Sequence, residues 1–350
     1  MPELINTAII LIMSSISISA GNEKHPNMRA MNMFRDLSAV ADLIELCFAD
    51  SMDRDGQRYV ADMRRASNDN GFLKWAANMT ETASLPLTGF IWEENNRIVG
   101  NASLIPFRDK GKKIYLIANI AVHPDHRRKS IARILTQRAM TYGWDKKASA
   151  LWLHVRDDNP GAIKLYADLG FQEIARRTTW TAKPDPLLSK PKTDTQIVTR
   201  HTRFWSQQRD WLRRLHPDVL GWYRPININS LRPGLMNWLY LMFVDMNIKH
   251  WAAIQGDKLL ATLSWTSQGN KSDTLIPATP PGQINAEEST QALLQLLIRA
   301  RRVLANRTTL SLEYPGGEMT DAFISAGFIE RRTLLWMRAE SATQRLSFRT

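Results

Sequence analysis

The chain has 350 residues, 44% of them hydrophobic and 23% charged, and its formal net charge is +12. This composition excludes wholesale disorder, and the length suits two globular domains better than one. The positive charge suits an anionic ligand, a nucleic acid or a membrane surface, but it cannot choose among them. The single cysteine, Cys47, excludes an intrachain disulfide framework and fits the cytoplasm, where we expect the protein to be.

Residues 1–28 are expected to be a disordered or mis-assigned leader. Residues 8–13 are apolar and small residues precede Gly21, but Glu3 lies ahead of the apolar run and no Lys or Arg does, unlike a signal peptide. The run is too short to span a bilayer, and no other segment is a transmembrane candidate. Met28 and Met31 are alternative translation starts.

Hydrophobic periodicity predicts alternating helices and strands up to about residue 180. A helix beginning at residues 36–38 carries Cys47 on its apolar face, which favours a buried structural thiol over a nucleophile. A short helix covers residues 59–66, and Asn95-Asn96 joins hairpin strands over 87–92 and 98–105. The later elements are a strand over 114–122, a helix to about 142, a strand over 150–155, a helix between Asn159-Pro160 and Gly170, and a strand over 171–180.

The stretch 114–132 combines a buried strand, a short basic loop and a helix start. Pro124 ends the strand because it has no backbone donor, and the loop continues through Arg127, Arg128 and Lys129 to the small residues Ser130 and Ala132. The first N–H groups of a helix are unsatisfied and the helix dipole favours negative charge there. The stretch therefore suits an anion site, although an ordinary strand-to-helix connection with surface arginines fits equally well.

The same stretch resembles the acyl-CoA-binding motif of the GNAT superfamily of N-acetyltransferases, Arg/Gln-x-x-Gly-x-Gly/Ala after Val-x-Pro. Here the motif reads Arg127-Arg128-Lys129-Ser130-Ile131-Ala132 after Val122-His123-Pro124. Ser130 replaces the usual Gly, which puts the affinity in doubt more than the identity of the site. Residues 159–166 and 169–171 resemble the second motif of the family, and the order of elements over residues 29–180 matches its fold.

The resemblance implies acetyl transfer from acetyl-CoA, as cosubstrate, to a primary amine on a small molecule or a peptide. It implies Tyr166 as the general acid, although a core tyrosine is the alternative interpretation from the residues alone. The implied cofactor-binding residues are Ile120, Ala121, Val122, Arg127, Arg128, Lys129, Ser130, Ile131, Ala132 and Asn159. Backbone N–H groups near Ala121 and Val122 would stabilise the oxyanion.

The general base is not identified by the sequence. Asn119 stands where many relatives keep a carboxylate, but an amide cannot accept the proton, and His154 qualifies by chemistry only. His123 and His126 are expected to flank the phosphate loop. The seven scattered histidines and one cysteine have no metal-ligand spacing, so we expect no metal.

The second half repeats the first weakly. After a proline-rich linker come a hairpin over 251–263, a helix over 290–304, a strand over 309–313, and Gly327-Phe328, which echoes Gly170-Phe171. We therefore expect an α/β (α+β) protein of two GNAT-like domains, each a mixed central sheet flanked by helices. The ranges are a leader over 1–28, an acetyltransferase domain over 29–181, a linker over 182–195 and a degenerate GNAT-like domain over 196–350.

The second domain is expected to keep the fold without the cofactor site. Counting back from the Gly-Phe pair, Tyr166 corresponds to Phe323, which has no hydroxyl, and residues 277–288 contain no Arg or Lys. Two rivals to an enzyme stay open. One is a regulatory protein that binds acyl-CoA without turnover; the less favoured one is a nucleic-acid-binding module that uses the basic surplus and the tryptophans of the second half.

Overall fold

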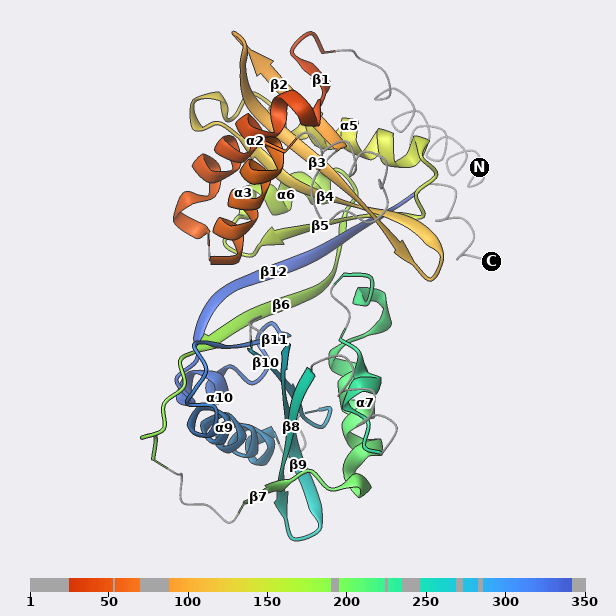
Figure 1. Ribbon diagram of the computed structural model, residues 1–350. Coiled ribbons are helices and arrows are strands. Elements are labelled where there is room, and N and C mark those ends of the chain that lie inside the picture. The colour runs from red at the N-terminus through yellow and green to blue at the C-terminus, as the bar shows by residue number, and fades with distance from the viewer. Residues whose placement is uncertain are drawn as a thin grey trace, which may run out of the picture. The chain divides into compact units, whose positions relative to one another are not determined.

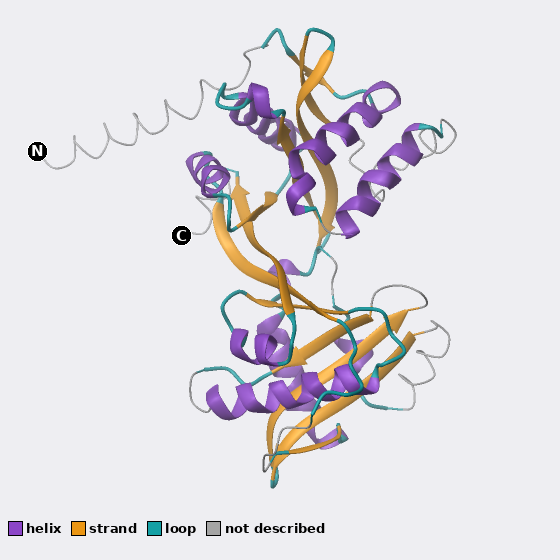
Figure 2. Cartoon of the chain, turned by 90° about the vertical axis from the view of Figure 1, so that its left-hand side faces the viewer, coloured by secondary structure: helices purple, strands orange, loops and turns teal. Residues whose placement is uncertain are grey.

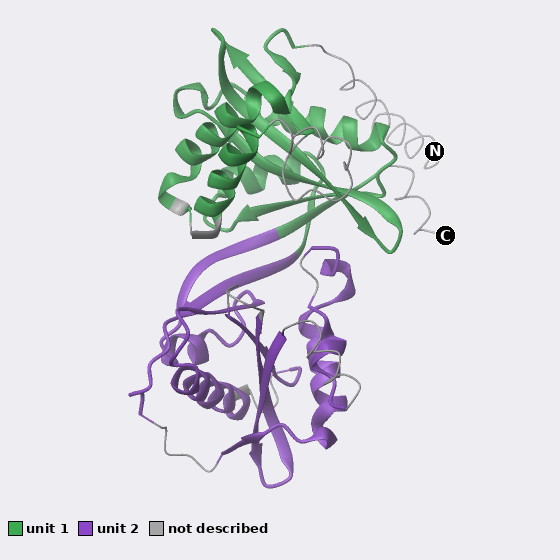
Figure 3. Cartoon of the chain, viewed as in Figure 1, with its two compact units in different colours: residues 1–174, 336–350 green, residues 175–335 purple. Residues whose placement is uncertain are grey.

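The computed structural model describes residues 25–52, 54–69, 88–189, 195–223, 226–234, 246–268, 273–282 and 286–341. Most of the expected leader and residues 190–194 of the expected linker lie outside these ranges. The chain forms two compact units, residues 1–174 with 336–350 and residues 175–335 (Figure 3). Within the described ranges no helix combines the length and the apolar character needed to cross a bilayer.

The first unit is a mixed sheet with helices packed on it (Figures 1 and 2). Its elements are β1 (Met28–Ala30), α2 (Met33–Phe48), α3 (Arg54–Ser67), β2 (Thr88–Glu94), β3 (Arg97–Asp109), β4 (Lys112–Val122), α5 (Ile131–Asp145), β5 (Ala150–Arg156) and α6 (Pro160–Asp168). The strand order is β1-β2-β3-β4-β5, with the end of β12 beyond β5. Neighbours from β1 to β4 are antiparallel, whereas β4 and β5 are parallel.

Two packing contacts fix the helices of this unit. The helices α2 and α3 share a core with the sheet in which Leu37, Met63 and Ile91 are fully buried. On α5, Ile131 and Leu135 approach the backbone of Gly100 so closely that a Cβ there would collide with them. The core therefore holds β3, and with it the neighbouring β4, in a fixed position.

The start of α2 differs from the expectation. The helix begins at Met33 and not at residues 36–38, because Asn32 is its N-cap and its side chain accepts a hydrogen bond from the Phe34 N–H at 3.0 Å. The Asp36 carboxylate accepts from the Asn32 N–H at 2.7 Å and from Arg29 at 2.6 Å. Asp36 is thus a buried partner of an arginine inside the first turn, whereas the sequence pattern placed it at the helix start, where Asp is a common N-cap residue.

The second unit repeats the same order of elements. They are β6 (Gln172–Ala182), β7 (Gln196–Thr199), α7 (Trp205–Leu215), β8 (Met246–Gln255), β9 (Lys258–Gln268), β10 (Asp273–Ala278), α9 (Ala286–Val303), β11 (Leu310–Pro315), α10 (Thr320–Ser325) and β12 (Ile329–Glu340). The strand order is β12-β6-β11-β10-β9-β8-β7. The parallel pair β10 and β11 is linked by α9, as β4 and β5 are linked by α5.

Strands β6 and β12 each contribute to both units. The first unit ends at Ile174 within β6 and resumes at Trp336 within β12. Inside the first unit the Trp336 ring lies 4.2 Å from the ring of His154 on β5, and inside the second Thr178 Oγ1 lies 2.8 Å from Thr333 Oγ1. The units are therefore interleaved along the chain, and a cut within residues 182–195 would separate each unit from one of its strands.

Candidate functional site

The central strand β4 contains a bulge at Asn119. Asn101 of β3 faces Ala121 and Ser103 faces Ala118, so two steps along β3 correspond to three along β4. Asn119 takes the left-handed conformation, with φ of +53°, which asparagine tolerates better than most residues. A bulge interrupts the ladder and turns backbone groups away from the neighbouring strand.

Two side chains hold this bulge. Asn101, which is fully buried, donates from Nδ2 to the Asn119 carbonyl at 2.8 Å and to Ser103 Oγ at 3.0 Å. Asn119 donates from its own Nδ2 to Tyr59 Oη on α3 at 2.8 Å. The Asn119 amide is therefore committed as a donor to a neighbouring helix, which supports a structural role for it at this position.

The strands β4 and β5 diverge next to the bulge. Their parallel pairing covers Ile114–Ala150, Tyr115–Leu151 and Leu116–Trp152, and both strands continue beyond these pairs. Ala118, Asn119, Ile120 and Val122 are only half-buried, although β4 is a central strand. Because ladder partners from β5 end at Trp152, backbone N–H and C=O groups of β4 are available to an extended polar ligand.

The loop after β4 leads to the N-terminus of α5. Arg127 to Ser130 are all exposed, and both Arg128 and Ser130 are left-handed, with φ of +64° and +60°. Ser130 is the N-cap residue, but its hydroxyl makes no capping hydrogen bond. Consecutive N–H groups in such a turn form a concave anion site that adds to the field of the helix N-terminus. The expected anion site is therefore formed by backbone as well as by side chains.

Arg127 also closes the loop against the end of β4. Its Nε donates to the Val122 carbonyl at 3.2 Å, and Cys47 Sγ of α2 donates to the same carbonyl at 3.3 Å. Burial raises the pKa of the Cys47 thiol. Cys47 is half-buried and not fully buried as expected, but a protonated thiol that donates to a backbone carbonyl suits the expected structural role.

Replacing Ser130 with Gly should make the loop more stable. A left-handed L-residue costs roughly 1–2 kcal/mol, and glycine removes that cost. The first unfolding transition of the full chain should rise by roughly 2–4 °C, which scanning calorimetry measures. Ser130→Ala, which keeps the Cβ, is the control and should give no gain; a loss of stability in Ser130→Gly would mean that the hydroxyl has a role of its own.

The helix α6 carries the two remaining predicted site residues. Asn159 Oδ1 accepts from the Ala162 N–H at 3.1 Å and so caps the helix. Tyr166 is 6% exposed, lies edge-on to Phe171, and has its phenol pKa raised by burial. The ion pair between Arg133 of α5 and Asp168, at 3.0 Å, joins the first turn of α5 to the end of α6. This ion pair therefore ties the end of α6, two residues after Tyr166, to the helix that follows the basic loop.

The histidines singled out by the sequence have structural contacts. The His154 ring packs on Trp336, His123 Nδ1 accepts from the Asp125 N–H at 3.3 Å, and His126 Nδ1 lies 3.1 Å from a Glu94 carboxylate oxygen. Among the described residues no group of three or more potential ligands could hold a metal ion. The predicted cofactor residues Ala121 and Ile131 are buried, so their side chains serve packing and only their backbone could meet a ligand.

Tyr59 and Asn101 were missed by the sequence analysis. Tyr59 marked only the start of an expected helix, and nothing local places it opposite residue 119. Asn101 could have been recognised in the sequence, because it interrupts the apolar run of β3. A polar side chain in a central strand must find a hydrogen-bond partner.

The central strand of this mixed sheet is bulged and diverges from its parallel neighbour, and a basic loop at a helix N-terminus follows it. This is the arrangement of the GNAT fold. Residues 50–171 match the model of the Acetyltransferase (GNAT) family, and the chain therefore carries a GNAT domain. The structure is similar to that of a GCN5-related N-acetyltransferase from Sphaerobacter thermophilus, with a TM-score of 0.51 at 12% identity over 90% of this chain and 96% of that one. The likeness extends the shared fold over most of the chain, as the order of elements predicted.

Two curated proteins resemble part of the chain. It is 37% identical over 67 residues to the ribosomal protein bS18-alanine N-acetyltransferase of Escherichia coli K12, across 19% of this chain and 45% of that protein. It is 36% identical over 86 residues to GCN5-related N-acetyltransferase 4, chloroplastic, of Arabidopsis thaliana, across 24% of this chain and 28% of that one. The chain thus spans less than half the length of these relatives.

Proposed function

We propose that the first unit is an N-acetyltransferase that moves an acetyl group from acetyl-CoA to a primary amine. The observation that carries the proposal is the divergence of β4 from β5 beside a bulge, with an exposed basic loop at the next helix N-terminus. An extended amide-rich chain suits the unpaired backbone of β4, and a pyrophosphate suits the loop. Acetyl-CoA has both parts and supplies the activated thioester.

The loop residues would hold the phosphates. Arg127, Arg128 and Lys129 supply positive charge, and the N–H groups from Ser130 to Ala132 supply donors at the start of α5. Ile120, Ala121 and Val122 would pair with the pantetheine arm through their backbone, as a missing strand would. Asn159, at the start of α6, would meet the same arm from the other edge of the opening.

The bulge would serve the chemical step. Negative charge develops on the thioester oxygen when the amine attacks, and backbone N–H groups near Ala121 and Val122 would stabilise it. Their direction depends on the bulge, which Asn101 and Tyr59 hold through residue 119. Tyr166, kept protonated by burial, would donate its proton to the departing thiolate.

Asn101→Ala should therefore lower turnover more than it weakens acetyl-CoA binding. Loss of the bond to the Asn119 carbonyl lets the bulge relax, and a misplacement of about 1 Å in a catalytic group costs up to about 10²-fold, so we expect turnover on the order of 10-fold lower. Steady-state kinetics with calorimetric titration of acetyl-CoA separates the two effects. Ser103→Ala, which leaves the bond between Asn101 and residue 119 intact, is the matched control. Equal loss in both variants would point to general destabilisation of β3.

The direct test of the function is a panel of amines scored for release of free CoA by the full chain. The panel includes small aliphatic amines, amino sugars and a peptide with N-terminal alanine, the last because one relative is named an alanine N-acetyltransferase. Release that depends on the amine supports the proposal, and no amine-dependent release over the panel would count against it.

A second candidate is a regulatory protein that binds acyl-CoA without turnover. It is favoured by Asn119, whose amide donates to Tyr59 and cannot take a proton from the acceptor amine. In that case titration would show acetyl-CoA binding, and no amine in the panel would cause release of free CoA.

We also propose that the two halves form a tandem arrangement in which only the first unit binds the cosubstrate. The predicted site lies within residues 29–181, in the first unit, and the second unit, which takes β6 from before residue 196 and ends at Leu335, would hold a diverged copy of the fold. The second unit would then support the first.

A further inference from the structure

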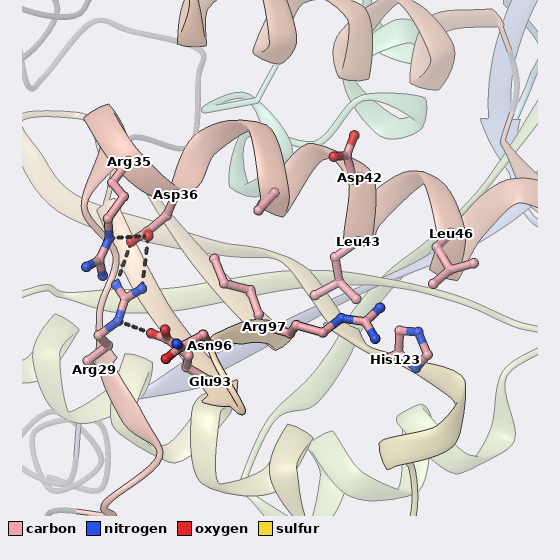
Figure 4. Close-up of a pocket in the computed structure, with 12 residues that line it drawn as sticks. Arg29, Arg35, Asp36, Asp42, Leu43, Leu46, Glu93, Asn96, Arg97 and His123 are labelled. Atoms are coloured by element: carbon pink, nitrogen blue, oxygen red, sulfur yellow. Dashed lines mark hydrogen bonds and ion pairs between the residues drawn. The ribbon is translucent and has the colours of Figure 1, made fainter.

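A pocket of about 460 Å³ lies in the first unit between α2 and the hairpin of β2 and β3 (Figure 4). Its walls come from one face of α2, from Arg29 of β1, from the turn of the hairpin and from His123 after β4. The volume is within the range of small-molecule sites, roughly 300–1,000 Å³. Apart from His123, which directly follows β4, the pocket is built from different elements than the opening between β4 and β5.

All the carboxylates in the pocket wall are neutralised by arginines. Asp36 accepts from Arg29 at 2.6 and 2.9 Å and from Arg35 at 3.0 Å, and Glu93 accepts from Arg29 at 2.5 Å. Although burial alone would raise the pKa of Asp36, its hydrogen bonds lower it, so the carboxylate stays charged and paired.

The remaining carboxylate is neutralised from outside the pocket. Asp42 accepts from Arg64 of α3 at 2.6 and 3.0 Å, and Arg64 does not line the pocket. No unpaired negative charge is therefore left in the wall to hold a cation.

Among the arginines that line the pocket, Arg97 differs from Arg29 and Arg35 in having no carboxylate partner among the described residues. Its side chain forms no ion pair or hydrogen bond within the described part of the chain, and its guanidinium lies between Leu43 and His123 in the pocket (Figure 4). With every carboxylate of the wall paired, this guanidinium supplies a net positive charge. An unpaired guanidinium in a concave wall suits a carboxylate, which it can bind through two parallel hydrogen bonds.

Apolar side chains line the same pocket. They are Leu43, Leu46 and Ile98, and Leu46 is 51% exposed. A ligand that covers Leu46 gains hydrophobic burial as well as the charge contact. A hydrophilic anion such as phosphate would leave that surface in water.

We propose that this pocket is a second ligand site, which takes a small carboxylic acid with an apolar chain. The carboxylate binds Arg97 beside His123, and the chain lies over Leu43, Leu46 and Ile98. His123 is the one lining residue next to the proposed acetyl-CoA site, since it directly follows Val122 of β4. The other lining residues belong to β1, α2 and the hairpin of β2 and β3, so the proposal can be tested without acetyl-CoA.

Octanoate is the probe, with octanamide as its neutral counterpart and inorganic phosphate as a hydrophilic anion. Calorimetric titration of the full chain, with no acetyl-CoA present, should show octanoate binding that exceeds octanamide binding by roughly 10-fold, the usual value of a charge-assisted hydrogen bond pair. Phosphate should bind more weakly than octanoate. Stronger binding of phosphate, or no difference between octanoate and octanamide, would overturn the proposal.

Two variants of equal charge test the position. Arg97→Gln should weaken octanoate binding by roughly 10-fold or more, whereas Arg35→Gln, at the far end of the same pocket, should leave it within about 2-fold. Leu46→Ser should weaken octanoate binding without affecting phosphate. Equal losses at Arg97 and Arg35 would show only a general effect of net charge. Displacement of octanoate by acetyl-CoA would assign the pocket to the cosubstrate and would also overturn the proposal.

Discussion

Tyr166→Phe is expected to lower the turnover of the full chain by roughly 10²-fold, the usual contribution of a general acid, while acetyl-CoA affinity stays nearly unchanged. Burial raises the pKa of Tyr166 above its ordinary value, so the hydroxyl keeps its proton beyond the pH at which an exposed tyrosine would lose it. A thiolate leaving beside it can take that proton, and phenylalanine offers none.

The substitution keeps the packing that the structure shows. Tyr166 is 6% exposed with its ring edge-on to Phe171, so removal of one oxygen leaves the contact between the rings in place. The measurement is kcat against saturating acetyl-CoA, with calorimetric titration for affinity and circular dichroism for fold. Phe171→Leu is the matched control, since it disturbs the same ring pair without touching a hydroxyl. Wild-type turnover in Tyr166→Phe would make Tyr166 a core residue only.

The dependence of kcat on pH is a second test of the role of Tyr166. A general acid acts below its pKa, and its contribution is lost as the pH rises through that value. Because the pKa is raised, the wild type should show no alkaline loss near the ordinary pKa of tyrosine, about 10. A fall in kcat of the wild type there, absent in Tyr166→Phe, would contradict the buried state described by the structure.

Local signals in the sequence predicted most of the elements. Asn95 and Asn96 both have positive φ, as the hairpin signal requires, and Gly170 ends α6 with φ of +89°. The parallel strand, loop and helix around residues 114–132 were predicted because each part has its own pattern: an apolar run, a proline and a helical spacing. Such signals depend only on residues that are close in the sequence, so they can be recognised before the fold is known.

Features that depend on distant partners were not predictable. The choice of Asn32 over residues 36–38 as helix start follows from Asp36 pairing with Arg29 and lying buried. The division of β6 and β12 between the units depends on which strand lies beside which, and an apolar alternating strand does not encode its partner. The two residues whose side chains hold the bulge, Tyr59 and Asn101, are 42 positions apart in the sequence, and no spacing rule connects them.

The second unit differs from the first where its two parallel strands separate. The ladder of β10 and β11 covers Asp273–Leu310 and Thr274–Ser311, after which the strands separate, as β4 and β5 do. Beyond that point Thr279 Oγ1 and Tyr314 Oη share a hydrogen bond of 2.7 Å, and both residues are fully buried. The Phe323 ring lies 5.3 Å from that of Tyr314. Buried side chains thus join the ends of the diverging strands.

The backbone supports the pairing of Phe323 with Tyr166. The Phe171 N–H donates to the Tyr166 carbonyl at 3.0 Å, and the Phe328 N–H donates to the Phe323 carbonyl at 2.9 Å. The two helices therefore end in the same way, and the hydroxyl is what differs. These contacts support the proposal that the second unit has no cosubstrate site.

Charge reversal at the basic loop, Arg127→Glu with Arg128→Glu, is therefore expected to abolish acetyl-CoA binding by the full chain. The change removes two positive charges and places two negative ones beside the expected pyrophosphate, so each charge-assisted contact becomes a repulsion. The wild type should bind one acetyl-CoA per chain in calorimetric titration, and the variant none. The full chain is the right material, because the exchange of β6 and β12 means that neither half keeps all of its strands alone.

The number of acetyl-CoA molecules bound per chain distinguishes the ways in which this prediction could fail. Lys146→Glu with Lys147→Glu, two exposed residues just after the far end of α5, makes the same change in net charge and should leave binding within about 2-fold, because salt screens charges more than about 10 Å apart. Two sites in the wild type, reduced to one by the loop reversal, would show that the second unit also binds acetyl-CoA despite the bond between Thr279 and Tyr314. One site that survives the reversal would move the phosphates away from the Arg127 loop altogether. Loss of the single site in the loop variant alone would place the cosubstrate in the first unit, where β4 and β5 diverge beyond Trp152.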